Sequence, residues 1–147
     1  MDRELGMEGY NEIEYLAGVL ACAEQESRIR QWDENGQVIL GDNGHAHGIY
    51  QIHDKWFNEN GKGYYRTDVE RLDKDIYYNI EKGVRHYTEK YKRALNLGYK
   101  PPARAAYSAY NGGRYGRYLK KGNYKWKKND DGFYDNYYRW LKKLGRK

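Results

Sequence analysis

Residues 41–52 read Gly-Asp-Asn-Gly-His-Ala-His-Gly-Ile-Tyr-Gln-Ile, and this stretch decides the fold. Its first four residues are typical of a turn, and residues 48–52 form an apolar run that favours a strand. Residues 37–40, Gln-Val-Ile-Leu, are also strand-like and follow a turn signal at residues 34–36. The sequence therefore predicts a small antiparallel hairpin in the first half of the chain.

The remainder of the chain favours helices. Apolar side chains recur at helical spacing over residues 11–30, 72–95 and 133–144. Pro101-Pro102 is expected to open one more helix and Asn111-Gly112-Gly113 to close it, since proline suits a first helical turn and glycine accepts left-handed angles. Asp130-Asp131 is expected to lead into the last helix, and residues 57–67 look irregular. The buried face of the first helix is predicted to comprise Ile13, Leu16, Ala17, Leu20 and Ala23. These patterns predict a mostly helical α+β fold with one small sheet.

Length and composition favour one domain over residues 1–147. The chain has only 2 Pro and no repeat, and no apolar run approaches the roughly 20 residues that span a bilayer. The N-terminus does not read as a secretory signal, and Cys22 is alone, which fits a reducing cytosol. We therefore expect a monomer that is made in the cytoplasm without a signal peptide.

The net charge of +6 is unevenly distributed. Residues 1–60 carry 4 Lys and Arg against 12 Asp and Glu, whereas residues 61–147 carry 23 against 9. A basic half attracts anionic polymers, among which charge does not distinguish nucleic acid, teichoic acid and peptidoglycan. Most of the 18 Tyr are expected to take the place of Phe in the core and at its rim, although Tyr also suits stacking on sugars.

Two glutamates near the end of the first predicted helix are candidates for acid catalysis. A general acid must hold its proton near neutral pH, and apolar surroundings favour the protonated form of a carboxyl group. Glu26 has Cys22 and Ala23 one turn before it, and Glu24 has Leu20 and Ala21. Periodicity alone does not separate the two.

Four ordered motifs supply a resemblance. They are Glu26-Ser27, the stretch Gly41-Asp42-x-Gly44-x-x-x-Gly48-Ile49-Tyr50-Gln51-Ile52, the pattern Asn79-Ile80-x-x-Gly83-Val84 and the corner Ala109-Tyr110-Asn111-x-Gly113. Together they resemble the goose-type lysozymes and the soluble lytic transglycosylases, over about residues 12–145. The resemblance implies a lysozyme-like fold and cleavage of the β-1,4 bond between N-acetylmuramic acid and N-acetylglucosamine, without a cofactor.

The resemblance also implies roles for individual residues. Glu26 matches the catalytic acid, and Asp42 matches the aspartate that goose-type enzymes use near the attacking water. The residues expected to bind or line the saccharide are Tyr50, Gln51, His53, Tyr107, Tyr110 and Asn111. Two positions depart from the pattern: His53 stands where a second aspartate is frequent, and Tyr50 replaces a methionine.

Two chemical outcomes follow from these matches. Hydrolysis, which we favour, needs a carboxylate such as Asp42 on the far side of the sugar to act on water. A transglycosylase needs only Glu26, first as acid and then as base, and forms 1,6-anhydromuramic products. The expected partner is the peptidoglycan glycan strand, in the setting of a phage-type endolysin or of a wall-penetrating part of a larger assembly.

Two other classes of function have weaker signals. His45 and His47 face the same side of an extended segment, with Asp42 and His53 nearby, so together with a carboxylate they could form the metal site of a wall peptidase or amidase. Residues 119–128 alternate cations with aromatic side chains, as in modules that bind single-stranded nucleic acid. We rank both below the glycosidase, and expect neither a metal nor a nucleic-acid partner.

Overall fold

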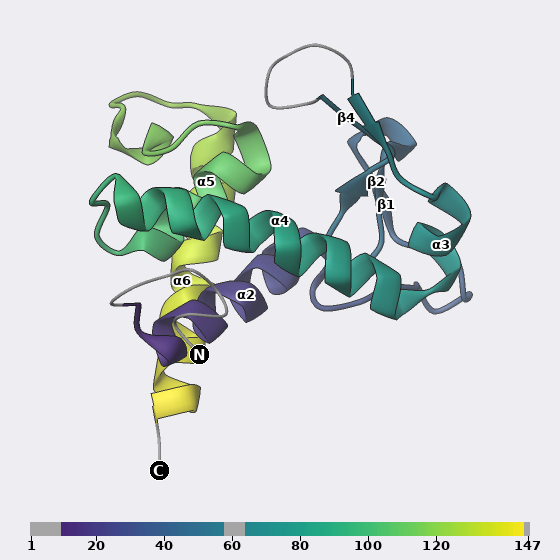
Figure 1. Cartoon of the computed structure of the whole chain (residues 1–147), viewed down its shortest axis with the longest axis horizontal. Helices are drawn as coiled ribbons and strands as arrows, with labels where there is room; N and C mark the ends of the chain where they lie inside the picture. The colour runs from purple at the N-terminus through teal and green to yellow at the C-terminus, as the bar shows by residue number, and fades with distance from the viewer. Residues whose placement is uncertain (1–9, 58–63, 146–147) are drawn as a thin grey trace. The chain divides into compact units, whose positions relative to one another are not determined.

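The computed structural model describes residues 10–57 and 64–145 (Figure 1). This part of the chain holds five α-helices and a three-stranded antiparallel sheet, with a further pair of short strands. The prediction of a mostly helical α+β fold is therefore confirmed. None of the helices in the described residues is long and apolar enough to cross a membrane.

The chain forms two compact units. One contains the described residues up to Gln25 and those from Arg85 onward, and the other is Glu26–Val84. Helices α2 (Glu12–Ser27) and α4 (Ile76–Asn96) each contribute residues to both units. The expectation of one catalytic domain over residues 1–147 stays a prediction.

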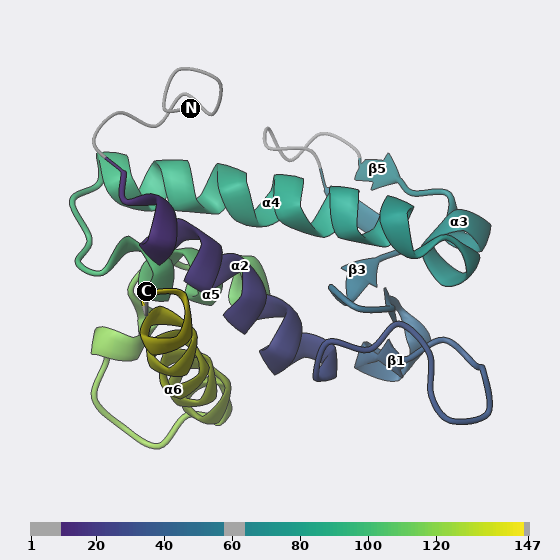
Figure 2. The same ribbon diagram turned by 90° about the horizontal axis from the view of Figure 1, so that it is seen from below.

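The first unit has an aromatic core formed with α5 (Pro102–Gly112) and α6 (Lys125–Gly145). Helix α5 packs on α6, as Figures 1 and 2 show, and the Tyr107 ring stacks on Phe133 with 4.5 Å between centroids. Tyr87 and Tyr91 of α4 are also fully buried. The expectation that tyrosines replace phenylalanines in the core is confirmed for these rings.

The buried face of α2 differs from the predicted one. Ala17 and Ala23 are buried as expected, but Ile13 and Leu16 are each 41% exposed. Tyr15 faces the core instead, because its ring packs on Tyr91 and its hydroxyl lies 2.6 Å from that of Thr88.

The second unit contains the predicted hairpin in a modified form. Strands β1 (Leu40–Gly41), β2 (Ala46–His47) and β3 (Ile52–His53) pair in that order, with Leu40 opposite His47 and Ala46 opposite His53. A short 3-10 helix, η1 (Asp42–Gly44), joins the first two strands. Residues 48–51 turn between β2 and β3 rather than extending a strand, because Gly48 and Gln51 both have positive φ.

Two further predictions about this unit were wrong. The segment 57–67 contains strand β5 (Tyr64–Arg66), which pairs with β4 (Lys55–Phe57), and residues 58–63 lie outside the described residues. The long helix is broken into α3 (Val69–Lys74) and α4 at Asp75, which has extended angles. The Asp75 carboxylate accepts hydrogen bonds from the N–H groups of Tyr77 and Tyr78, and so caps the start of α4.

The C-terminal helices are predicted with mixed success. Helix α5 begins at Pro102, and Gly113, with φ 74°, donates its N–H to the Ala109 carbonyl and closes it, as expected. Helix α6 begins at Lys125, five residues before the predicted lead-in at Asp130. Asp130 is buried inside the helix because it pairs with Arg117, which belongs to the 3-10 helix η2 (Arg117–Leu119).

Candidate active site

The C-terminal end of α2 is tied to the glycine-rich loop within the second unit. The Ser27 hydroxyl donates to the Ile49 carbonyl at 2.7 Å in a buried hydrogen bond, and accepts one from the Arg30 N–H. Glu26, the predicted acid, precedes Ser27 in the last helical turn and is half-buried. The pair Glu26-Ser27 thus combines a candidate acid with the group that fixes its backbone to the loop.

Two buried amide side chains hold the turn after β2. Gln31 accepts the Ile49 N–H through Oε1 at 2.9 Å and donates through Nε2 to the Leu72 carbonyl at 2.7 Å. Asn79 accepts the Tyr50 N–H at 3.0 Å and donates to the His47 carbonyl at 2.8 Å. These bonds satisfy main-chain groups that would otherwise be costly to bury.

Gly48 is required by this arrangement. Its φ is +75°, and a Cβ there would lie 2.4 Å from both Asn79 Nδ2 and Gln31 Oε1. The same holds where Tyr50 packs on α4, since a Cβ at Gly83 would lie 2.1 Å from Tyr50 Cγ. Tyr50 itself is only 4% exposed. Asn79, Gly83 and Tyr50 therefore build the turn, and Tyr50 has little surface for a ligand.

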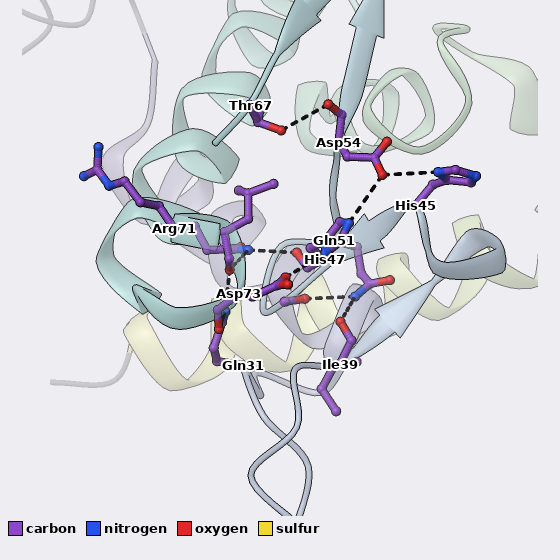
Figure 3. A network of polar contacts seen from close by, with 12 residues as sticks. Gln31, Ile39, His45, His47, Gln51, Asp54, Thr67, Arg71 and Asp73 are labelled. Atoms are coloured by element: carbon purple, nitrogen blue, oxygen red, sulfur yellow. Dashed lines mark hydrogen bonds and ion pairs between the residues drawn. The ribbon is translucent and has the colours of Figure 1, made fainter. Parts of the chain in front are cut away.

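Gln51 braces the same loop, as Figure 3 shows. It has φ 51°, and its Nε2 donates to the carbonyls of Ile39 and Gly48 at 3.1 and 3.0 Å. Its Oε1 lies against Gly41, where a Cβ would approach it to 2.3 Å. Gln51, which was predicted to bind the sugar, thus uses its amide nitrogen to hold the loop.

Asp42 and His53 meet at the edge of the small sheet. Gly41 pairs with Ala46 and Ala46 with His53, so the pairing of the three strands brings Asp42 next to His53. His53 Nε2 lies 2.9 Å from Asp42 Oδ2, and the two side chains are 38% and 60% exposed. The structure therefore places the carboxylate predicted to act on water next to His53.

The other two loop histidines form a separate network (Figure 3). His45 Nδ1 and His47 Nε2 lie 3.2 and 3.6 Å from the same Asp54 oxygen, and His47 Nδ1 lies 2.7 Å from Asp73 Oδ1. Burial raises the pKa of Asp54, but the two histidines outweigh it and leave that pKa below its ordinary value. Within residues 10–57 and 64–145, no group of three His, Cys, Asp or Glu side chains is placed to hold a metal ion.

Glu24, the rival acid, is engaged in the first unit. Its Oε1 accepts the Trp140 indole N–H at 2.8 Å, and its Oε2 pairs with the Arg139 guanidinium. Both carboxylate oxygens therefore bind α6. This gives Glu24 a structural function that periodicity could not reveal.

The first unit also holds the three remaining predicted ligands. Tyr107 is fully buried, so it supports its neighbours rather than presenting a surface. The Tyr110 ring stacks near Tyr107, with centroids 6.4 Å apart, and the His86 ring centroid lies 4.8 Å away. Asn111 is exposed, and its Oδ1 accepts a hydrogen bond from Arg117.

His86 was not a candidate from sequence, because a lone histidine on a helix carries no distinctive pattern. Burial and then the charge of Lys90 lower its pKa to about 4, against a bond to the Tyr110 main chain that acts in the opposite direction. His86 is thus a half-buried support beside Tyr110, and its lowered pKa leaves it neutral near pH 7. The pairing of Arg117 with Asp130 was also missed, because it is visible only in the folded chain.

The strip proposed for nucleic acid is partly engaged with itself. The Tyr124 ring stacks on Trp126 with centroids 4.1 Å apart, and Lys120 Nζ lies 4.8 Å over the same ring. Residues from Lys125 onward belong to α6 rather than to a loop. The Tyr124 ring is therefore already occupied by neighbours.

The predicted site residues fall into two groups. Glu26, Asp42, Tyr50, Gln51 and His53 belong to the second unit, and Tyr107, Tyr110 and Asn111 belong to the first. No family model, curated protein or solved structure matches this chain.

Proposed function

We propose that this protein is a lysozyme-like muramidase that cleaves the β-1,4 bond between N-acetylmuramic acid and N-acetylglucosamine, with Glu26 as general acid. The observation that carries the proposal is the buried Ser27–Ile49 hydrogen bond, which fixes the helix end bearing Glu26 to the Gly41–Ile52 segment. Both Glu24 oxygens bind α6, which supports a structural role for Glu24. The proposal joins this geometry to the resemblance of the four motifs.

The acid step follows from the place of Glu26. Glu26 is half-buried in the last turn of α2, and the proposed acid step requires its carboxyl group in the protonated form. In that form it transfers its proton to the glycosidic oxygen as the bond to the sugar carbon breaks.

Asp42 then acts on water. Its Oδ2 lies 2.9 Å from His53 Nε2, and in the proposed step its Oδ1 takes a proton from the attacking water. The contact with His53 restrains the orientation of Asp42. We therefore favour hydrolysis over the transglycosylase outcome.

The first experiment is mass spectrometry of the products released from purified peptidoglycan, with and without EDTA. Reducing muramic ends support the hydrolase with Asp42 in use. Products lighter by one water, with 1,6-anhydro ends, assign a transglycosylase. Peptide cleavage that stops with EDTA would transfer the activity to His45 and His47, and the absence of products would refute the enzyme.

Two glutamine variants form a matched pair for this assay. Glu26→Gln keeps the shape of the side chain and removes the transferable proton, so product release should stop while the melting temperature is retained. Glu24→Gln should continue to release products. If instead Glu24→Gln is inactive and Glu26→Gln active, the assignment of the acid is wrong.

The same proposal covers partners and setting. The substrate is the peptidoglycan glycan strand, bound by a monomer that needs no cofactor. The protein would act on the bacterial wall as an endolysin or within a larger assembly. Size-exclusion chromatography with light scattering tests the monomer directly.

A further inference from the structure

A buried ion pair lies directly behind Asn111. The Arg117 guanidinium donates to both oxygens of Asp130, with Nε 3.0 Å from Oδ2 and Nη2 2.5 Å from Oδ1. The two side chains are only 8% and 1% exposed. Asp130 is held within α6, so it gives the guanidinium a fixed position.

The same guanidinium reaches the end of α5. Arg117 Nη2 also donates to Asn111 Oδ1 at 2.8 Å. It can approach because residue 112 is glycine: a Cβ there would lie 2.0 Å from Arg117 Nη1. The two glycines after Asn111 therefore have different functions, since Gly113 caps the helix and Gly112 makes room for Arg117.

This contact determines which end of the Asn111 amide is exposed. Arginine has only donors, so the amide oxygen of Asn111 must face Arg117 and the NH2 group must point away from it. Of the amide's two ends, the oxygen is thus used inside the protein. The exposed end is a hydrogen-bond donor.

We propose that Arg117, anchored by Asp130, is a positioning residue that makes Asn111 a hydrogen-bond donor to an acceptor oxygen of the bound saccharide. The inference rests on the proposed function, because it takes the ligand of Asn111 to be an amino sugar chain. It adds a specific chemistry: the site selects acceptor oxygens at this point, and a ligand group that only donates does not fit.

Asn111→Asp is the most informative variant. A carboxylate keeps the acceptor that Arg117 binds, so the fold is retained, but it has no donor for the ligand. Loss of one such hydrogen bond should weaken binding of tri-N-acetylchitotriose by about tenfold. Arg117→Lys keeps the charge opposite Asp130 but lacks the fork that also reaches Asn111, so it should raise KM about tenfold with kcat little changed.

The experiment measures chitotriose binding by calorimetry, peptidoglycan turnover, and the NMR signals of the Asn111 side-chain NH2 group in the full chain. Arg117→Lys should shift those NH2 signals. The double variant with both Asn111→Ala and Arg117→Lys should bind no more weakly than Asn111→Ala alone. Arg114→Ala, at an exposed position in the same loop, is the matched control and should bind and turn over as the wild type does.

The outcomes separate this inference from the function beneath it. If the wild type cleaves peptidoglycan but Asn111→Asp binds chitotriose normally, the donor assignment is wrong and the muramidase stands. Additive losses from Asn111→Ala and Arg117→Lys would refute the positioning role in the same way. If the wild type neither binds nor cleaves, the muramidase and this inference fail together.

Discussion

Acid should destabilise this protein through the half-buried side chain of His86. Its pKa is about 4 in the folded chain against an ordinary value of 6.5, because burial and the charge of Lys90 disfavour the imidazolium. Between these values the unfolded chain binds a proton that the folded chain does not. Stability is therefore complete above the ordinary value and falls as the pH decreases toward the folded value.

The size of the effect follows from the two pKa values. Because the unfolded chain binds this His86 proton more tightly than the folded chain does, the free energy of unfolding falls by about 2 kcal/mol between about pH 7.5 and about pH 5. This is a large fraction of the roughly 5–15 kcal/mol that a domain of ordinary stability possesses. Asp54 contributes in a lower pH range: its lowered pKa stabilises the folded chain, and this stability is lost only below the ordinary pKa of 3.8.

The assay is urea unfolding at several pH values, for the wild type and for His86→Gln. Glutamine retains a donor for the Tyr110 main chain but does not titrate. The variant should lose the pH dependence, so the difference between the two proteins should shrink by about 2 kcal/mol across that range. Equal pH dependence in both proteins, or an NMR titration of His86 near its ordinary pKa, would refute the reasoning.

Three further substitutions test the scaffold, each by urea unfolding. Gly48→Ala should cost about 2 kcal/mol more than Gly36→Ala, because both glycines have left-handed φ but only Gly48 lacks space for a Cβ; equal costs would contradict the crowding. Ser27→Ala should cost about 1–3 kcal/mol, since it leaves the Ile49 carbonyl buried without its donor. Glu24→Gln should cost about 1 kcal/mol or less, as its ion pair with Arg139 is partly exposed; a cost of several kcal/mol would indicate a tighter network.

The parts of the fold that local chemistry determines were predictable from sequence. Helix α5 begins at Pro102 because proline fits a first turn, and it ends before Gly113 because glycine fits the left-handed cap. The break at Asp75 was missed because the apolar spacing continues across it, while a side-chain cap restarts the helix. Strands β4 and β5 were missed because their stabilisation comes from pairing with each other.

The candidate site was likewise predictable only in part. Sequence brought attention to Glu26, Asp42 and Asn111 through motifs, but it could not separate Glu26 from Glu24, because both follow apolar residues on one helix. The bonds of Glu24 to α6 were not predictable, because those partners lie more than a hundred positions along the chain. His86 and the Arg117–Asp130 pair were not identifiable for the same reason, since their partners are distant or their burial depends on the fold.

Exposure and bonding together indicate which motif residues are available for chemistry. Gln31, Asn79 and Gln51 use their amides on main-chain groups, and a change in any of them would alter the loop before it altered a reaction. Asp42 and Asn111, in contrast, each bind one protein group and keep exposed polar atoms. A substitution at these two positions should therefore change turnover or binding with little loss of stability, whereas the buried amides should show the reverse. Comparing unfolding free energy with product release across the two sets separates scaffold from site, and a similar loss of both quantities at Asp42 would remove it from the proposed mechanism.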